Sequence, residues 1–379
     1  MKKALIVTTV SGFVPQFEMN NVRILQRLGY EVHYASNFRT PVYGKDNRRL
    51  DGSGVVRHQV DFVRSPFRVW ENVRAYGQLK RVIEKGDYDL IHCHTPMGGA
   101  LARLAAHRAG VRAKVVYTAH GFHFYKGAPV WNWMIYYPVE RWLARYTDLL
   151  ITINREDYKR SKKFRLKPGG RTVHVPGVGI RYPIERGADQ DPRGEPGHVY
   201  TFVSVGELSR RKNHQAGIRA AAYLKYLMPE MKFRYFVYGK GPKERELLNM
   251  VHTYKLSDCV RLKGYEPDPE KLYGNADCFL FPSLQEGLPV ALMEAMAWRL
   301  PVIASAIRGN NELVVPGKGG YLAGKQNIRE YAEGMAEMLC NPEAGRQMGR
   351  WNETAVAAYS EERVMKRMEK CYQWLQMNQ

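Results

Sequence analysis

Residues 285–297 read Gln285-Glu286-Gly287-Leu288-Pro289-Val290-Ala291-Leu292-Met293-Glu294-Ala295-Met296-Ala297. This stretch follows a strand-like apolar run at 277–281 and precedes Pro301. Proline suits the first turn of a helix, where its missing N–H costs nothing, so residues 290–297 are predicted to form a helix. A helix N-terminus has unpaired N–H groups and a positive dipole end, so it favours an anion such as a phosphate.

Two carboxylates flank this predicted helix start. Glu286 lies in the loop before the helix, and Glu294 lies about a turn and a half inside it. Such a pair can accept hydrogen bonds from several hydroxyls of one ligand. The residues therefore suggest a ligand with a phosphate, a ribose and a sugar. The alternative is that Glu286 only caps the helix and Glu294 is solvated, and these residues alone leave both open.

Strand-like and helix-like runs alternate along the chain, which at 379 residues has room for two domains. The alternation predicts parallel sheets with helical crossovers and ligands beyond the carboxyl ends of the strands. Residues 187–198 are rich in Gly, Pro and charge and predict an interdomain linker. The expected parts are an N-terminal domain at 1–186, this linker, a second domain at 199–355 and a last helix in 356–379. The expected strands are residues 4–10, 31–35, 89–93, 114–118, 149–153, 200–205, 233–238, 260–263, 277–281 and 301–304.

The positive charge is concentrated in one half of the chain. The net charge is +21; residues 1–180 hold 30 basic and 13 acidic residues, or +17, whereas residues 181–379 hold 28 and 24, or +4. This asymmetry indicates an anionic partner, which is a membrane surface, a nucleic acid or a phosphorylated substrate, although a solvated basic face explains part of it. Segments 64–70 and 131–138 interleave basic and aromatic residues. That composition suits a membrane headgroup layer or single-stranded nucleic acid, and about half of these aromatics are expected in the core.

The cysteines and the apolar runs of the sequence predict the cellular compartment of the protein. The chain has 5 cysteines with no paired spacing, which argues against a disulfide framework and for a reducing compartment. The N-terminal apolar run is short and lacks a cleavage site, so a buried strand is expected there rather than a signal peptide. No run approaches the roughly 18 apolar residues that a spanning helix needs. We expect a cytoplasmic protein that is at most membrane-associated.

Histidines follow two of the predicted strands in the first half. His92 and His94 alternate on one strand and are candidate metal ligands, but no third ligand has a recognisable spacing. His120, beside Gly121 at another strand end, is better placed to meet a ligand, with a hydrogen-bonded structural histidine as the alternative. Gly12 lies in the small-residue turn after the first strand.

Basic residues and glycines occupy the corresponding turns of the second half. Arg210, Arg211 and Lys212 lie in its first turn, where a parallel sheet presents its ligand edge. Together with the helix after Pro289 they can hold a diphosphate, because Arg binds phosphate bidentately and Lys as a point charge. The turn at 239–242, Gly-Lys-Gly-Pro, permits close backbone approach, but one such turn is weak evidence.

Taken together, these residues resemble glycosyltransferase family 4, the retaining GT-B enzymes. The resemblance covers essentially the whole chain, and its strongest point is the E-x7-E motif formed by Glu286 and Glu294. Segments 205–213, 239–242 and 305–310 support it. Segments 92–96 and 118–127 resemble the EpsD-type exopolysaccharide-biosynthesis members of the family.

The resemblance implies an α/β chain with two Rossmann-like domains facing a cleft, and a C-terminal helix that returns to the N-terminal domain. It implies transfer of a sugar, with an N-acetylhexosamine as the suggested one, from a UDP-sugar to a lipid-diphosphate-linked acceptor in exopolysaccharide biosynthesis. The protein would work at the inner face of the cell membrane, with an anionic membrane surface as partner and no nucleic acid. No cofactor and no metal are expected, and no DxD-type metal motif lies near the predicted site.

The family pattern also assigns roles to residues of this chain. Glu294 would bind the ribose and Glu286 the donor sugar, while Lys212 would neutralise the leaving diphosphate. One departure is Glu207, which stands where many members have Arg, so Arg210 or Arg211 would supply the second cation. The implied set is catalytic Glu286, His120 and Lys212, and donor-binding Glu294, Gly287, Leu288, Arg211, Arg210, Gly239, Gly241 and Gly12.

The implied chemistry is electrostatic. Cleavage of the anomeric bond leaves an oxocarbenium-like sugar and a diphosphate that gains negative charge, which cations and a helix dipole stabilise. Retention without an obvious nucleophile resembles front-face displacement. Two alternatives stay open: a GT-B nucleotide-sugar epimerase, and a non-catalytic basic protein that binds membrane or nucleic acid. Salt-sensitive RNA binding without nucleotide-sugar binding would favour the last.

Overall fold

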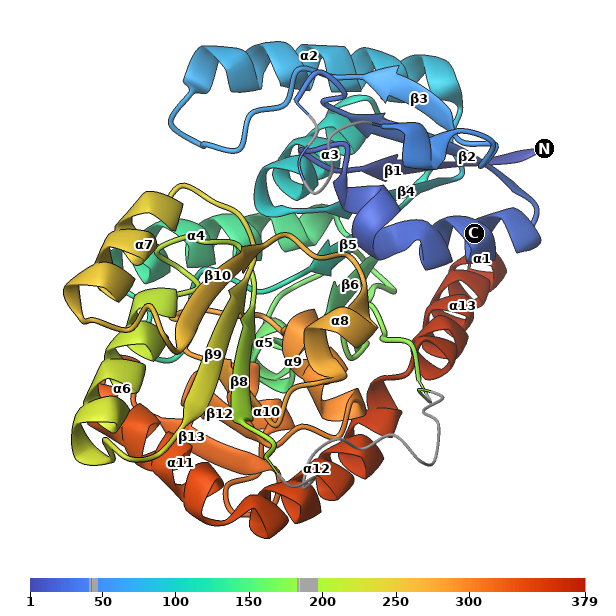
Figure 1. The fold of residues 1–379 in the computed structure, drawn as a ribbon. Coiled ribbons are helices and arrows are strands. Elements are labelled where there is room, and N and C mark those ends of the chain that lie inside the picture. Colours follow the sequence, from blue (N-terminus) through green and yellow to red (C-terminus); the bar gives the residue numbers. More distant parts are fainter. Residues whose placement is uncertain (41, 43–46, 183, 185–196, 379) are drawn as a thin grey trace. The chain divides into compact units, whose positions relative to one another are not determined.

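The computed structural model describes residues 1–40, 42, 47–182, 184 and 197–378, which form two compact units (Figure 1). One unit comprises Met1–Gly179 and Glu362–Gln379, and the other comprises Ile180–Glu361. All of the predicted linker except residues 197 and 198 lies outside the described residues. Among the described helices, none is long and apolar enough to cross a membrane.

The first unit is built on a seven-stranded parallel sheet in the order β3-β2-β1-β4-β5-β6-β7. Its strands are β1 (Lys2–Val7), β2 (Tyr30–Ser36), β3 (Val56–Gln59), β4 (Leu90–His94), β5 (Lys114–Ala119), β6 (Leu149–Thr152) and β7 (Arg171–His174). Its helices are α1 (Met19–Arg27), α2 (Val69–Gly86), α3 (Pro96–Arg108), α4 (Val130–Leu143), α5 (Arg155–Ser161) and α13 (Glu361–Met377), with short turns η1 (Val14–Glu18), η2 (Arg48–Leu50) and η3 (Ala144–Tyr146).

Helices cover both faces of this sheet, so its strands are apolar on both sides, as parallel strands require. Leu5 and Val7 of β1 pack in one cluster with α2 and α3, whereas Ala4 and Ile6 pack in another with α1 and α13. The alternation follows from the two-residue period of a strand. The C-terminal helix α13 thus belongs to the core of the first unit, as the GT-B pattern implies, and lies beside α1 in Figure 1.

The second unit is built on a six-stranded parallel sheet in the order β10-β9-β8-β11-β12-β13. Its strands are β8 (Tyr200–Val205), β9 (Phe233–Tyr238), β10 (Val260–Gly264), β11 (Cys278–Phe281), β12 (Val302–Ser305) and β13 (Gly320–Ala323). Its helices are α6 (His214–Leu227), α7 (Glu244–Thr253), α8 (Pro269–Tyr273), α9 (Val290–Ala297), α10 (Asn310–Leu313), α11 (Ile328–Cys340) and α12 (Pro342–Val356), with a short turn η4 (Ala357–Tyr359).

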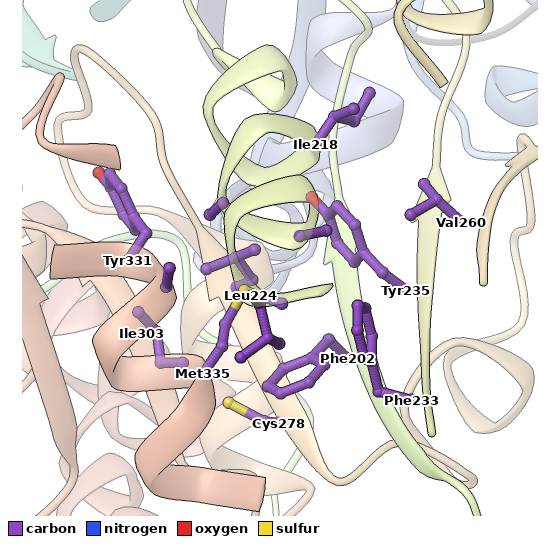
Figure 2. Close-up of a cluster of buried hydrophobic side chains, with 14 of the residues drawn as sticks. Phe202, Ile218, Leu224, Phe233, Tyr235, Val260, Cys278, Ile303, Tyr331 and Met335 are labelled. Carbon is purple, nitrogen blue, oxygen red and sulfur yellow. The ribbon is translucent and has the colours of Figure 1, made fainter. Parts of the chain in front are cut away.

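The main core of this unit lies between its sheet and the helices α6 and α11. Figure 2 shows Leu224 of α6, Met335 of α11 and Phe202 of β8 converging at its centre. All three side chains are fully buried. This packing holds the sheet rigid, so that the loops at its carboxyl edge have a fixed base.

The predicted α/β architecture with two Rossmann-like sheets is confirmed, and the differences concern element bounds and some shorter strands. The first strand ends at Val7 rather than residue 10. Pro289 is not in the first turn of α9 but immediately precedes it, with extended backbone. The strands β3, β7 and β13 and the helix α2 were not predicted from the sequence.

Candidate functional site

Both sheets have a switch point, where neighbouring strands are followed by connections that run to opposite sides. It lies between β1 and β4 in the first unit and between β8 and β11 in the second. Ligands of open α/β sheets bind beyond the carboxyl ends of strands at such points. The predicted site residues follow these strands: Lys212 follows β8, Glu286 follows β11, His94 ends β4, and His120 follows β5.

Glu286 is the centre of a buried ion-pair cluster in the second unit. Its Oε1 accepts hydrogen bonds from Lys212 Nζ at 2.8 Å and from Arg211 Nη1 at 3.0 Å. The side chain of Glu286 is 8 % exposed and that of Lys212 is 12 % exposed, whereas Arg211 is 46 % exposed. The ammonium of Lys212 also lies 4.7 Å from the centre of the Phe281 ring, a cation–π contact. Glu286, Lys212 and Arg211, which were predicted from separate parts of the sequence, therefore form one cluster.

Burial and charge act in opposite directions on this carboxylate. Burial by itself raises the pKa of Glu286, but the cations of Lys212 and Arg211 outweigh it, so the pKa lies below the usual value. Burial also lowers the pKa of Lys212, and Glu286 only partly offsets that effect. The cluster is therefore a carboxylate held ionised by two cations, one of which reaches solvent.

Backbone contacts fix the two loops that carry this cluster. Asn213 has a left-handed backbone, with φ of 55°, and its Nδ2 donates to the carbonyl of Pro282 at 3.0 Å. The N–H of Leu284 donates to the carbonyl of Arg211 at 2.8 Å. Arg308 Nε donates to the carbonyl of Glu286 at 3.2 Å. The loops after β8 and β11 are thus joined directly, which orients Lys212 and Glu286 before any ligand arrives.

The N-terminus of α9 has no side-chain cap. Pro289 is the residue before the helix and makes no side-chain capping hydrogen bond, and the first turn contains no acidic residue. Among the described residues, the side chain of Glu286 bonds with Lys212 and Arg211 rather than with an N–H of α9. The alternative in which Glu286 only caps α9 is therefore wrong. Gly287 precedes this terminus with its carbonyl against Gly309, where a Cβ would lie 2.6 Å from that oxygen. Leu288 is buried, so only its backbone is suited to a ligand contact.

Glu294 of α9 is half-buried and has a specific partner. The hydroxyl of Tyr273, at the end of α8, donates to Glu294 Oε2 at 3.0 Å. Burial raises the pKa of Glu294, and the Tyr273 hydrogen bond lowers it by a smaller amount. The alternative in which Glu294 is merely solvated is therefore also wrong.

The glycines of the second unit serve the packing of its own loops. Gly239 has φ of 146°, and a Cβ there would lie 1.9 Å from the carbonyl oxygen of Gly206. A Cβ on Gly241 would lie 2.5 Å from the carbonyl oxygen of Leu208. These glycines let the loop after β9 lie against the loop after β8, which carries Lys212. The close approach that the sequence analysis expected toward a ligand is used within the protein.

Two charged residues of the same loop make no hydrogen bond or ion pair with Glu286 among the described residues, although the charge of Glu207 acts to raise the pKa of Lys212. Arg210 and Glu207 are both exposed, and Glu286 takes its second cation from Arg211. The geometry therefore brings Arg211 and Lys212 together with Glu286 and leaves Arg210 at the surface.

The histidines of the first unit form a buried chain under the carboxyl ends of β4 and β5. His92 Nδ1 bonds with the hydroxyl of Tyr372 and His92 Nε2 with that of Thr118, each at 2.8 Å. His94 Nδ1 shares a hydrogen bond with His120 Nε2 at 3.0 Å. Burial lowers the pKa of His92 to about 3 and that of His120 to about 4. These rings are neutral groups, and His92 is saturated by its own partners.

Glu18, at the end of η1, completes this cluster and was missed by the sequence analysis. Its Oε1 lies 3.5 Å from His94 Nδ1 and 3.5 Å from His120 Nε2. Burial raises the pKa of Glu18 to about 8, and a hydrogen bond from Asn21 opposes the shift. The three ligand-type atoms lie close enough together to share one metal ion.

Gly12 lies in the same region, in the turn after β1. It is buried, and a Cβ there would lie 1.6 Å from the carbonyl oxygen of Val42. A side chain is therefore excluded at this position by the protein itself.

The residues that sequence reasoning missed had weak local signals. Glu18 is the only acidic residue between β1 and α1, in an otherwise apolar and aromatic stretch, and that isolation is the one available hint. Tyr273 ends a short helix and carries no pattern that links it to Glu294.

Comparison with known proteins identifies the chain's family. Residues 19–179 match Glycosyltransferase Family 4, and residues 185–354 match Glycosyl transferases group 1. The chain is 36 % identical over 379 residues to the putative glycosyltransferase EpsD of Bacillus subtilis, covering 98 % of this chain and 96 % of that one. It is 29 % identical to the UDP-Gal:alpha-D-GlcNAc-diphosphoundecaprenol alpha-1,3-galactosyltransferase of Escherichia coli, over 71 % of this chain and 70 % of that one.

A solved structure has the same fold. Anabaena HepE, determined in complex with UDP, superimposes with a TM-score of 0.74 at 17 % identity, covering 98 % of this chain and all of HepE. The two Rossmann-like units, the matched families and the EpsD relative agree. The chain therefore belongs to the glycosyltransferases of family 4, with the GT-B fold.

Proposed function

We propose that this chain is a retaining glycosyltransferase that moves a sugar, with an N-acetylhexosamine as the first candidate, from a UDP-sugar to a lipid-diphosphate-linked acceptor in exopolysaccharide biosynthesis. The observation that carries the proposal is the cluster in which Lys212 and Arg211 meet Glu286 beside the uncapped start of α9. A leaving diphosphate is the anion that two cations and a helix N-terminus stabilise best.

Each residue of the cluster then has a role toward the donor. Lys212 and Arg211 turn from Glu286 toward the diphosphate, and the N–H groups that begin α9 bind its oxygens. Glu286 is released to accept hydrogen bonds from the sugar hydroxyls, and Glu294 accepts them from the ribose. Because the negative charge grows on the diphosphate as the anomeric bond breaks, these cations act most strongly in the transition state.

The cations remove the need for a metal ion at the donor site. The leaving phosphate oxygen takes the proton of the acceptor hydroxyl, which then attacks from the same face of the sugar, so the configuration is retained. UDP as the nucleotide is supported by the complex of HepE with UDP. A lipid-diphosphate acceptor is supported by the named substrate of the Escherichia coli relative and by the excess of basic residues in the first half.

The deciding experiment measures binding and transfer with purified full-length protein. A panel of UDP-, GDP- and ADP-sugars is titrated calorimetrically in buffer with EDTA, and transfer to an undecaprenyl-diphosphate-linked sugar is followed. We expect one UDP-sugar to bind, Glu286→Ala to abolish transfer, and proton NMR of the product to give the anomeric configuration of the donor. Arg219→Gln, an exposed change on α6, is the control. Release of an epimer without acceptor, or no nucleotide-sugar binding at all, would contradict the proposal.

The first unit also carries two exposed aromatic segments, at the start of α2 and on α4, that suit the membrane that holds such an acceptor. Its exposed apolar side chains include Phe67 and Trp70 near the start of α2, at 82 % and 84 % exposure, and Trp131 and Trp142 on α4, at 70 % and 44 %. Exposed arginines at 64, 68, 141 and 145 lie in the same segments. Aromatic side chains in the headgroup layer with cations toward anionic lipid are the physical basis of peripheral binding.

Vesicle sedimentation tests these segments. The full chain should bind vesicles that contain anionic lipid more strongly than neutral ones, and added salt should weaken the binding. Trp131→Ser together with Trp70→Ser should reduce it. Tyr226→Ser, which removes an 80 % exposed aromatic from the second unit, is the matched control. Equal binding to neutral and anionic vesicles would refute the electrostatic contribution to membrane binding. The proposed location of the protein is the cytoplasmic face of the cell membrane.

A further inference from the structure

We propose that Glu18, His94 and His120 bind one zinc-type divalent transition-metal ion in the first unit, with a fourth position open to water. This site goes beyond the proposed transfer function. Glu18 and His94 have no role in that function, whereas His120, which the family pattern lists as catalytic, would also serve as a ligand here.

The fold brings the three side chains together from separate parts of the sequence. Glu18 ends η1, which follows β1, while His94 ends β4 and His120 follows β5. These three strands are neighbours in the sheet, in the order β1-β4-β5. Their carboxyl ends therefore meet, and the missing third ligand beside His94 is a carboxylate far away in the sequence.

Two of the three separations between the ligand atoms are close to those of a tetrahedral site, and the third is a hydrogen bond between the two imidazoles that has to lengthen slightly. Glu18 Oε1 lies 3.5 Å from His94 Nδ1 and 3.5 Å from His120 Nε2, and the two nitrogens are 3.0 Å apart. A tetrahedral zinc ion with bonds of about 2.0–2.1 Å holds its ligand atoms about 3.3–3.4 Å apart. Two imidazoles and a carboxylate form a ligand set that zinc uses in sites with an open position.

Charge balance favours a cation at this position. The side chain of Glu18 is 3 % exposed, and among the described residues no lysine or arginine lies within ion-pair distance of it. Two other buried carboxylates of this unit differ: Glu140 meets Arg103 at 2.9 Å, and Asp148 meets Lys167 at 2.7 Å. The ionised form of a carboxylate buried without a cation is costly, and a bound divalent ion would supply the positive charge which that form requires.

The surroundings have further features of a metal site. Asn21 Nδ2 donates to the other oxygen of Glu18, which orients the carboxylate as the outer partners of metal ligands do. The ring of Phe13 packs on His120 at 4.9 Å and on His94 at 5.8 Å. A cavity of about 20 Å³ borders Glu18 and His120, which is room for about one water molecule.

His92 is excluded as a ligand even though it alternates with His94 on the strand. Both of its ring nitrogens are occupied, by the hydroxyls of Tyr372 and Thr118. A second histidine pair in the same unit supplies a matched control. His33 Nδ1 bonds His58 Nε2 at 2.8 Å, but Glu31 lies against the other nitrogen of His33, so the three groups cannot converge on one ion.

The test uses the full chain, stripped with a chelator and dialysed. Zinc chloride is titrated calorimetrically, and the metal content is then measured by mass spectrometry. We expect one zinc ion per chain, and the stripped protein loaded with cobalt(II) should show the visible bands of a four-coordinate ion. Glu18→Gln and His94→Gln should each weaken zinc binding by more than the roughly 10–100-fold that loss of an outer partner costs. His58→Gln should bind zinc as the wild type does.

Two outcomes would overturn the site. The first is a wild-type chain that binds no zinc at micromolar concentration and gives no four-coordinate cobalt spectrum, in which case the three groups only share hydrogen bonds. The second is zinc binding that His58→Gln loses and Glu18→Gln keeps. If Glu18→Gln or His94→Gln does not fold, His120→Gln replaces them, because His120 is 22 % exposed and its change is tolerated more easily.

Discussion

Glu286 in the second unit and Glu18 in the first are both buried carboxylates at the switch point of a parallel sheet. Glu286 meets two cations, Lys212 at 2.8 Å and Arg211 at 3.0 Å. Among the described residues Glu18 meets no lysine or arginine: its partners are the imidazoles of His94 and His120, each at 3.5 Å, and the amide of Asn21. The pKa of Glu286 lies below its usual value, whereas burial raises that of Glu18 to about 8.

We call the carboxyl end of the first sheet, with Glu18, His94 and His120, the first edge, and that of the second sheet, with Glu286, Lys212 and Arg211, the second edge. The difference indicates that the side chains around the buried carboxylate, and not its burial or its position in the fold, decide what each edge can bind. Both carboxylates lose water to a similar extent, because their exposed fractions are 8 % and 3 %. Cations beside Glu286 leave a positive group ready for an anion when Glu286 turns to another partner. The imidazoles beside Glu18 are neutral and share one hydrogen bond, and when the proton of that bond is displaced, both nitrogens offer a lone pair to a cation. One fold therefore presents two edges of opposite preference, and each edge can be changed separately.

The largest expected effect follows from removing the buried cation of the second edge. Lys212→Met keeps the side-chain length but cannot stabilise the leaving diphosphate. We expect kcat for sugar transfer to fall by about 10²–10³-fold, the range for loss of one preorganised group at a developing charge. The zinc affinity of the first unit should not change. Loss of zinc binding in this variant would show that the two edges are not independent.

Replacing Glu286 or Glu18 by glutamine should lower the free energy of unfolding by different amounts. Glu286→Gln leaves Lys212 buried without its ionic partner, so the free energy of unfolding should fall by about 1–3 kcal/mol at pH 7. Glu18→Gln strands no cation, so in metal-free protein its cost should stay below about 1 kcal/mol. Urea unfolding of both variants measures the difference, and equal losses would break the comparison.

The same variant gives a pH dependence with a defined sign. The folded-state pKa of Glu286 is depressed, so its stabilisation is present above its unfolded pKa and is lost as the pH falls through the folded value. The stability gap between wild type and Glu286→Gln should therefore be constant between pH 7 and 6 and shrink below about pH 4.5. A gap that widened on acidification would mean that the ion pair with Lys212 does not stabilise the fold.

Sequence patterns found one edge better than the other, for physical reasons. Glu286 and Lys212 lie in turns, and Glu294 lies in the helix that begins after Pro289. The glycines, prolines and flanking apolar runs around them are local signals, so their places after β8 and β11 could be predicted. The pairing of Glu286 with Lys212 is a tertiary contact that no spacing encodes. Glu18 lies in a five-residue turn with no periodic pattern, and its meeting with His94 depends on strand order.

The two neighbouring arginines of the second edge should differ in importance. Arg211 Nη1 contacts Glu286, whereas Arg210 is exposed and belongs to no contact of that cluster. We expect Arg211→Gln to lower kcat/KM for the UDP-sugar about tenfold, equivalent to about 1.4 kcal/mol, and Arg210→Gln to change it less than about twofold. Steady-state kinetics at two salt concentrations checks this. A larger loss of kcat/KM in Arg210→Gln than in Arg211→Gln would mean that Arg210, and not Arg211, makes the second contact with the diphosphate.

The smallest effects come from two tyrosine hydroxyls, one behind each edge. Tyr372 bonds His92 Nδ1 at 2.8 Å, and Tyr273 donates to Glu294 Oε2 at 3.0 Å. Each Tyr→Phe change removes one buried hydrogen bond and should cost about 1 kcal/mol of unfolding free energy. Only Tyr273→Phe should also raise KM for the UDP-sugar, because Glu294 loses the group that orients it toward the ribose. Thermal unfolding and donor KM of both variants test this, and a KM change in Tyr372→Phe would show that the sheet of the first unit transmits strain to donor binding.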